Sequence, residues 1–322
     1  MKILIILPNW LGDAIMSTPA IELLAQKYPH AMFTFVGSYA SIEAMKHHPR
    51  CEKAIVDMTK KSANRFVATY KLAKELGEFH LAVSFRNQLH ATLLLRFTNT
   101  VVCCARKSWH AMFLLSHAPQ INTKQHLVLQ YCDIATINFQ MKPKEIPALK
   151  LYIPKKEFHK PTLGINAGAT YGSAKRWYPE RFAEVAAALA DRYEIMIFGG
   201  PNEIEMAGDI EKALMTCGVI NYTNMAGKTT IEELCALIGG CALFITNDSG
   251  PMHVAAAYQV PTVAIFGPTR YLETSQWMNK KSKIVRHEMK CSPCMKRECP
   301  LGHHECMTTI TAGEVLEAVK SL

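Results

Sequence analysis

An apolar run ends in a turn of small and polar residues at positions 244–257, and an alanine-rich stretch follows it. The run predicts a buried strand and the alanines a helix, whose free N–H groups and positive dipole end would face the carboxyl end of the strand. Gly250 lets a ligand approach the backbone closely, and Pro251 suits a first helical turn, where its missing N–H would be unpaired anyway. The turn from Thr246 to His253 therefore predicts a site for the diphosphate of a nucleotide-activated substrate.

Three side chains of this turn are candidate contacts for such a donor. Ser249 can cap the helix and donate a hydrogen bond to phosphate. Asp248 would repel a phosphate, so we expect it to orient the turn or to bind a sugar hydroxyl; a plain helix cap is the alternative. His253 lies one turn inside the helix, where it contacts the ligand or serves as a structural histidine.

A second polar segment, residues 8–14, follows the first predicted strand. It stands where a dinucleotide-binding fold carries G-x-G-x-x-G, but that glycine pattern is absent. Asp13 would instead lie at the start of the first helix, where it could act as a general base or simply complement the helix dipole. Its neighbours Asn9, Trp10 and Gly12 are candidate acceptor-binding residues.

The second half opens with a strand and a loop of small residues, 164–179, which contains Lys175 and Arg176. Small residues permit close approach of a ligand, and the cations offset phosphate charge. The loop is not a P-loop, because Gly-x4-Gly-Lys-Ser/Thr does not occur. Thr170 in this loop is a candidate donor contact. After the next strand, Glu203 or Asn202 is a candidate partner for a ribose hydroxyl.

The chain has 36 Lys and Arg against 27 Asp and Glu, a net charge of +9. This excess predicts a polyanionic partner such as phosphate, an acidic sugar, anionic lipid or nucleic acid; a solvated basic surface is the alternative. Arg65 and Arg86 fall near predicted strand ends in the first half and are candidate acceptor-binding residues. No helix-turn-helix, ribonucleoprotein aromatic motif or arginine-rich arm occurs, so we expect no nucleic-acid partner.

A cysteine-rich segment lies near the C-terminus. It contains Cys291, Cys294, Cys299 and Cys306, with His303 and His304 between the last two. These residues are enough ligands for tetrahedral zinc, but their spacing is more compact than that of common zinc ribbons. We therefore favour packed thiols, or a loop whose Lys296, Arg297 and histidines contact substrate, and expect that no cofactor is required.

Short apolar strands alternate with helical patterns, which is typical of α/β folds with parallel sheets. Expected strands are 2–7, 32–37, 53–56, 81–85 and 100–104, then 162–167, 194–199 and 242–246. A helix is expected at 66–76 with Asn64 as its cap, and Thr311 with Glu314 forms a capping box for a last helix.

Proline recurs among lysines between residues 142 and 161, which excludes a helix or a central strand there. We place the domain boundary in this stretch. The prediction is two Rossmann-like domains, residues 1–150 and 160–310, that face each other across a cleft with Asp13 toward it. A C-terminal helix over 311–322 is expected to pack back on the first domain.

Four motifs resemble the bacterial ADP-heptose:lipopolysaccharide heptosyltransferases, inverting enzymes of glycosyltransferase family 9 with the two-domain GT-B fold. They are Gly12-Asp13, Lys175-Arg-Trp-Tyr-Pro179, Asn247-Asp-Ser-Gly-Pro-Met-His253 and Pro261-Thr-Val-Ala-Ile-Phe-Gly-Pro-Thr269. The segment from Cys299 to Met307 most resembles heptosyltransferase II, which adds the second heptose of the inner core.

The resemblance implies ADP-L-glycero-D-manno-heptose as the donor, bound mainly by the second domain, and heptosyl-Kdo2-lipid A as the acceptor at the first. It implies a catalytic base at Asp13, a contact of Lys175 with the donor phosphates, and donor binding by Asp248, Ser249, Gly250 and His253. Tyr171, beside Thr170, departs from the expected pair of hydroxyl residues. Transfer onto Kdo, as in heptosyltransferase I, and a GT-B nucleotide-sugar 2-epimerase are the alternatives.

Eleven cysteines without an apparent signal peptide predict a reducing compartment, and no apolar stretch approaches the roughly 20 residues of a membrane-spanning helix. Together with the resemblance, this predicts a cytoplasmic enzyme with peripheral contact to the inner face of the inner membrane. No Asp-x-Asp pair occurs of the kind that metal-dependent transferases use, so the transfer is expected to need no divalent metal.

Overall fold

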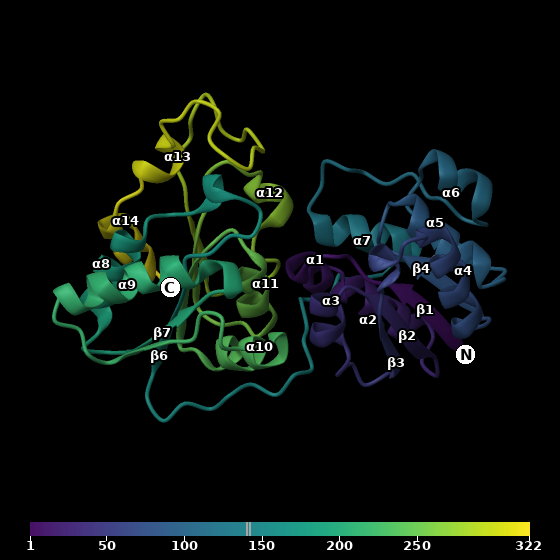
Figure 1. Ribbon diagram of the computed structural model, residues 1–322, viewed down its shortest axis with the longest axis horizontal. Coiled ribbons are helices and arrows are strands. Elements are labelled where there is room, and N and C mark those ends of the chain that lie inside the picture. The colour runs from purple at the N-terminus through teal and green to yellow at the C-terminus, as the bar shows by residue number, and fades with distance from the viewer. Residues whose placement is uncertain (140, 142) are drawn as a thin grey trace. The chain divides into compact units, whose positions relative to one another are not determined.

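The structure, a computed structural model, describes residues 1–139, 141 and 143–322. It divides into two units, Met1–Tyr152 and Ile153–Leu322, and each contains a parallel sheet with helices on its faces (Figure 1). The division falls inside the proline-rich stretch in which the boundary was expected; residue 142, where that stretch begins, lies outside the described residues.

The first unit has a five-stranded sheet of order β3-β2-β1-β4-β5. Its strands are β1 (Lys2–Ile6), β2 (Met32–Gly37), β3 (Cys51–Val56), β4 (Leu81–Ser84) and β5 (Cys103–Ala105). Its helices are α1 (Leu11–Met16), α2 (Thr18–Lys27), α3 (Tyr39–Met45), α4 (Arg65–Leu76), α5 (Leu89–Phe97), α6 (Trp109–Leu114) and α7 (Leu127–Thr136), with 3-10 turns η1 (Thr59–Lys61) and η2 (Ile137–Phe139).

Strand β1 shows why this sheet is covered on both faces. Alternate side chains of a strand point to opposite faces, and all four residues from Ile3 to Ile6 are fully buried. Leu4 and Ile6 pack in one cluster with residues of α4 and α5, so Ile3 and Ile5 face the other helical layer. Such continuous apolar strands are typical of parallel sheets.

The second unit has a six-stranded sheet of order β11-β10-β9-β6-β7-β8. Its strands are β6 (Thr162–Asn166), β7 (Glu194–Phe198), β8 (Tyr222–Asn224), β9 (Leu243–Asn247), β10 (Thr262–Ile265) and β11 (Ser282–Val285). Its helices are α8 (Pro179–Leu189), α9 (Ile204–Thr216), α10 (Ile231–Gly240), α11 (Gly250–Ala257), α12 (Tyr271–Thr274), α13 (Glu305–Thr308) and α14 (Ala312–Lys320), with 3-10 turns η3 (Ser173–Lys175) and η4 (Pro201–Glu203).

Both sheets have the strand order of a Rossmann fold, in which the chain leaves the first strand on one side and later returns to pair on its other side. The reversal lies between β1 and β4 in the first unit and between β6 and β9 in the second. Ligands of such sheets bind beyond the carboxyl ends of the strands at this point. The polar segments singled out in the sequence follow β1, β6 and β9.

Helix α14 corrects one expectation. It begins with the predicted capping box, in which the Glu314 N–H donates to Thr311 Oγ1 and the Thr311 N–H to the Glu314 carboxylate. Its Val315 is fully buried in the second unit's core, where the helix packs with α8, β10 and β11. Because its apolar face is covered there, the helix belongs to the second unit and the expected packing on the first domain is wrong.

The chain around the division is attached to the unit on each side. The Lys150 N–H donates to Thr18 Oγ1, and the Tyr152 hydroxyl donates to Glu22 at 2.7 Å. On the other side the Ile153 carbonyl accepts from Tyr258 Oη at 2.7 Å, and the Lys156 N–H donates to the carbonyl of residue 236. Each unit therefore holds its own part of the connection.

Candidate functional site

The turn between β9 and α11 forms the centre of the site in the second unit. Helix α11 begins at Gly250 with Pro251 in its first turn, as the sequence predicted. Ser249 occupies the N-cap position, but its side chain makes no cap hydrogen bond: Oγ lies 3.2 Å from Thr246 Oγ1 and accepts from Asn166 Nδ2 at 3.4 Å. The predicted cap by this hydroxyl is therefore wrong. Pro251 has no N–H and the Met252 N–H donates to the Ser249 carbonyl at 3.2 Å, so the helix start offers an anion the Gly250 N–H and the positive end of the helix dipole.

Asp248 and Lys175 form an ion pair beside the start of α11. Lys175 Nζ lies 2.5 Å from Asp248 Oδ2 and also donates to the Asp248 carbonyl at 3.2 Å. Thr269 Oγ1 donates to the same carboxylate oxygen at 2.6 Å, and Asp248 is only 4% exposed. The carboxylate is thus not a plain helix cap. It pairs with the lysine ammonium and with Thr269 beside the turn, and its expected role in orienting the turn or binding a sugar hydroxyl stays a prediction.

The loop after β6 places its backbone against Glu203. The Glu203 carboxylate lies against Gly168, where a side chain would collide with it unless the glutamate moved. Glu203 also accepts from the Gly200 N–H at 2.8 Å, which fixes the carboxylate at the carboxyl end of β7. Thr170 lies exposed in the same loop, and Tyr171 lies with its ring centroid 4.9 Å from Lys175 Nζ.

Two buried side chains lock this loop to the turn. Asn247 Nδ2 donates to the Ala167 carbonyl at 2.5 Å, and its Oδ1 accepts from the Trp177 N–H at 3.0 Å. Trp177 is itself fully buried and donates from its indole to the Ile310 carbonyl. Neither Asn247, Asn166 nor Thr269 was predicted as a site residue, although Asn247 and Thr269 stand inside the quoted motifs.

His253 is placed differently from the other predicted donor residues. It lies in α11 and is 3% exposed, within a helix whose residues 252–256 are all buried. Its role in donor binding stays a prediction, because burial in the helix equally fits the structural alternative.

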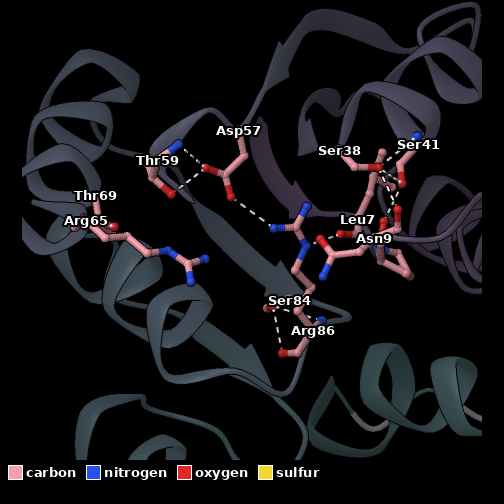
Figure 2. Close-up of polar contacts among 11 residues, drawn as sticks. Leu7, Asn9, Ser38, Ser41, Asp57, Thr59, Arg65, Thr69, Ser84 and Arg86 are labelled. Atoms are coloured by element: carbon pink, nitrogen blue, oxygen red, sulfur yellow. Dashed lines mark hydrogen bonds and ion pairs between the residues drawn. The ribbon is translucent and has the colours of Figure 1, made fainter. Parts of the chain in front are cut away.

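The first unit carries a second polar cluster at the reversal between β1 and β4 (Figure 2). Arg86, directly after β4, is 8% exposed; its Nε donates to the Leu7 carbonyl at 2.5 Å and its Nη1 to Asp57 Oδ2 at 3.0 Å. Burial alone would raise the pKa of Asp57, but hydrogen bonds from Thr59 and the Arg86 charge outweigh it and lower the pKa. The arginine thus joins the ends of β1, β3 and β4.

Unused hydrogen-bond donors gather at this cluster. Figure 2 shows the Arg65 side chain extending from α4 toward Asp57 and Arg86. Burial lowers the pKa of His90, and the nearby charge of Arg65 lowers it further. Within the described part of the chain, Arg86 Nη2, Arg65 Nε and His90 Nδ1 are buried without a hydrogen-bond partner. Buried polar atoms normally have partners, so the two arginine nitrogens, which can only donate, indicate an anion site.

Asp13 lies in the first turn of α1, as predicted, and is partly exposed. Burial raises the pKa of Tyr131 well above its ordinary value, and the negative charge of Asp13 adds to the rise, which places the two groups close together. Trp10 is exposed at the N-cap position of α1, Gly12 is buried, and the Asn9 carbonyl accepts from Ser38 Oγ at 2.7 Å.

The predicted residues therefore form two groups, one in each unit. The second unit brings together Lys175, Asp248, Ser249 and Gly250 at the start of α11, with Glu203 held against the neighbouring loop. The first brings Arg65 and Arg86 together at the ends of β1 and β4. The sequence prediction did not include His90 and Asp57, which lie in the first unit's cluster, since neither belongs to a recognisable local motif.

The chain is similar to known proteins over its length. Residues 69–305 match the sequence model of glycosyltransferase family 9 (heptosyltransferase). The chain is 37% identical over its whole length to Lipooligosaccharide heptosyltransferase 2 of Campylobacter jejuni subsp. jejuni serotype O:2, of which it covers 98%. It is 28% identical over its whole length to Lipopolysaccharide heptosyltransferase 2 of Escherichia coli K12, of which it also covers 98%.

Solved structures agree with the sequence relatives. The structure of E. coli ADP-heptose lps heptosyltransferase II superimposes with a TM-score of 0.85 at 25% identity and covers all of this chain and 98% of that one. E. coli heptosyltransferase WaaC with ADP gives a TM-score of 0.82 at 17% identity, with 100% and 99% of the two chains covered, and shows the same fold. The predicted fold, two Rossmann-like domains of the GT-B type, is confirmed.

Proposed function

Because the chain belongs to glycosyltransferase family 9, the heptosyltransferases, we propose that it transfers L-glycero-D-manno-heptose from ADP-heptose to the inner-core heptose of heptosyl-Kdo2-lipid A. The observation that supports binding of the ADP-heptose donor is the ion pair of Lys175 with Asp248, which lies beside the start of α11, where no side chain caps the helix. A cation and the positive end of a helix dipole, with the Gly250 N–H, suit a diphosphate. Relatives named heptosyltransferase 2 favour the second heptose over transfer onto Kdo.

We assign the chemistry of the transfer to both units. In an inverting transfer the acceptor hydroxyl oxygen attacks the anomeric carbon while the bond from that carbon to the diphosphate oxygen breaks. The hydroxyl proton passes to the Asp13 carboxylate as general base. The electron pair leaves with ADP, whose added negative charge is stabilised by Lys175 and the Gly250 N–H at the start of α11. Asp248 keeps the lysine in position for this role.

Binding of the acceptor is supported by the polar cluster of the first unit around Arg86. Heptosyl-Kdo2-lipid A carries carboxylate and phosphate groups, and an anion at the cluster would accept from Arg86 Nη2 and Arg65 Nε, which are otherwise buried without partners. Asp57 balances only one of the two arginine charges, which leaves the cluster positive. We therefore propose that Arg65 and Arg86 bind an acidic group of the acceptor.

We also propose that the first unit contacts the inner face of the inner membrane, where a lipid A-linked acceptor resides. No helix of the described chain is long and apolar enough to cross a membrane. Residues 59–124 hold ten lysines and arginines against two glutamates, and on α6 Trp109 is 69% and Phe113 83% exposed. Aromatic rings with flanking cations suit an anionic lipid surface.

The test of the proposed function is a product assay with purified protein and ADP-heptose. Heptosyl-Kdo2-lipid A is expected to gain one heptose, and Kdo2-lipid A is expected to stay unmodified. Product from Kdo2-lipid A alone would instead assign transfer onto Kdo. An isomerised sugar nucleotide in the donor-only reaction would assign an epimerase, and no product in any arm would refute a heptosyltransferase.

For the membrane contact, the measurement is sedimentation with vesicles of neutral lipid and of neutral plus anionic lipid. The protein is expected to bind the anionic vesicles, and a Trp109→Ser, Phe113→Ser variant is expected to bind them more weakly. Equal binding by this variant and the unchanged protein would exclude α6 as the contact.

A further inference from the structure

The cysteine-rich segment lies against the loop after β6, at the 3-10 turn η3. The Ala174 N–H donates to the Arg297 carbonyl at 3.0 Å, and Tyr171 Oη donates to the Met295 carbonyl at 2.8 Å. At Gly172 the backbone of Arg297 packs so closely that a side chain would collide with it. The loop is therefore supported by a segment that lies 124 residues later in the sequence at the tyrosine contact.

His304 adds a side-chain contact from this segment to the same loop, and both nitrogens of its ring take part. Nε2 lies 2.9 Å from the Ala174 carbonyl oxygen, and Nδ1 lies 3.0 Å from Tyr178 Oη. Because a carbonyl oxygen only accepts hydrogen bonds, Nε2 carries the proton, and in the neutral ring Nδ1 accepts from the tyrosine hydroxyl. The imidazole thus bridges the chain on the two sides of Lys175.

The histidine is itself held by the core of the second unit. Its carbonyl accepts from the Met307 N–H at 2.9 Å and from the Thr308 N–H at 3.0 Å, at the start of α13. Met307 is fully buried in the core cluster of this unit. The imidazole therefore extends from a backbone that is fixed to the core.

We propose that His304 is a positioning residue for Lys175, an inference that rests on the phosphate contact proposed above for this lysine. The Ala174 carbonyl belongs to the peptide group that joins Ala174 to Lys175, so the hydrogen bond from His304 fixes the lysine backbone. Asp248 holds the other end of the lysine, 2.5 Å from Nζ. A lysine whose two ends are fixed loses little conformational entropy when it binds a phosphate, so donor affinity depends on the histidine.

The affinity of the full-length protein for ADP, measured by calorimetry, tests this role with two substitutions at one position. Asparagine tolerates the positive φ of 52° found at His304, but its amide reaches only the Nδ1 position, so His304→Asn loses the hydrogen bond to Ala174. We expect ADP to bind about threefold to fivefold more weakly, as for the loss of one neutral hydrogen bond. His304→Gln, whose amide nitrogen reaches the Nε2 position, is expected to restore most of the affinity.

The matched control is His303→Asn, at the neighbouring exposed histidine, which is expected to bind ADP as the unchanged protein does. Unchanged affinity in His304→Asn, or equal losses in His304→Asn and His304→Gln, would overturn the proposal. Tyr178→Phe decides the question if His304→Asn does not fold, because it removes only one hydroxyl of a partly exposed ring and leaves Nδ1 without its donor. We expect about twofold weaker ADP binding from this variant, and unchanged affinity would overturn the bridge.

A double-mutant cycle with Lys175→Ala separates positioning of the lysine from a general loss of structure. If the histidine acts through the lysine, His304→Asn should weaken ADP binding no further in the Lys175→Ala background. The same loss in both backgrounds would overturn the proposal. If Lys175→Ala alone leaves the affinity unchanged, the phosphate contact is refuted and the positioning role with it. If Lys175→Ala weakens binding and His304→Asn does not, the positioning role alone is overturned.

Discussion

The polar clusters of the two units differ in how their charges are balanced. In the second unit the Lys175 ammonium is paired with Asp248, which also accepts from Thr269, so the lysine is already held before any ligand arrives. In the first unit Asp57 faces Arg86 and Arg65, and nitrogens of both arginines have no partner among the described residues. The cluster of the second unit is thus already paired internally, whereas the cluster of the first unit has unpaired donors to which, as proposed above, an anion would bind.

Asp13→Asn is expected to have the largest effect, and to change kcat without changing ADP binding by the second unit. The amide cannot accept the hydroxyl proton, so kcat should fall about 10²- to 10⁴-fold, the usual contribution of a general base. ADP affinity, which depends on the second unit, should not change. Steady-state kinetics and calorimetry measure the two quantities, with Asp209→Asn at an exposed residue of α9 as the control. Full turnover in Asp13→Asn would exclude this residue as the base.

The next largest effect is expected at the acceptor cluster. Arg86→Met removes charge-assisted hydrogen bonds that are worth about 1.5 to 3 kcal/mol each, so the acceptor KM should rise about tenfold to a hundredfold. The donor KM should stay the same. Arg96→Met, at an exposed arginine of α5, is the matched control. A rise of the donor KM together with that of the acceptor would contradict a separate anion site in the first unit.

Lys175→Ala tests the donor cluster and should have a smaller effect on binding. Asp248 already offsets part of the lysine's attraction for a diphosphate. We therefore expect the ADP affinity to fall by about tenfold, which corresponds to the lower end of the roughly 1.5 to 3 kcal/mol that a charge-assisted hydrogen bond contributes. Calorimetry measures it, and Lys212→Ala at an exposed lysine is the control. An unchanged affinity would refute the phosphate contact.

The smallest expected effect is on stability, at the capping box of α14. Hydrogen bonds from Thr311 and His287 lower the pKa of Glu314 from its ordinary 4.5 to about 2. A depressed carboxyl pKa stabilises the fold fully above pH 4.5 and loses that contribution as the pH falls toward 2. Since the side chain is 44% exposed, the contribution is about 1 kcal/mol.

Glu314→Gln should therefore lower Tm modestly at neutral pH, with the difference from the unchanged protein shrinking as the pH falls from 4.5 toward 2. Thermal unfolding over a pH series measures this, with Glu317→Gln on the same helix as the control. A Tm difference that is independent of pH would show that the carboxylate charge is not responsible.

Local features of the fold were predictable from the sequence because their causes are local. Asn64 caps α4 by accepting from the Val67 N–H at 3.1 Å, as its position before the apolar pattern indicated. The strand expected at 100–104 is instead Cys103–Ala105, because Thr98 and Thr100 bond each other in the turn that follows α5. Strands β8, β10 and β11, each three or four residues long, were not predicted.

The site was predictable where its residues share one motif and not where the fold joins distant segments. Lys175 and Asp248 were identified individually, but their ion pair spans 73 residues of sequence and depends on β6 and β9 being neighbours in the sheet. Asn247 could have been predicted as a site residue, because it stands in the quoted motif Asn247-Asp-Ser-Gly-Pro-Met-His253. His90 could not, because its position near Arg65 results from the packing of α4 with α5.

The attachment of the chain at the division has a mechanical consequence. The peptide passes between the units once, and its anchors, Tyr152 on Glu22 and Ile153 on Tyr258, belong to consecutive residues. A hinge usually spreads a rotation over several residues of loop, but here the free length is close to a single peptide. The segment that passes from one unit to the other is therefore held on both sides up to the peptide bond between Tyr152 and Ile153.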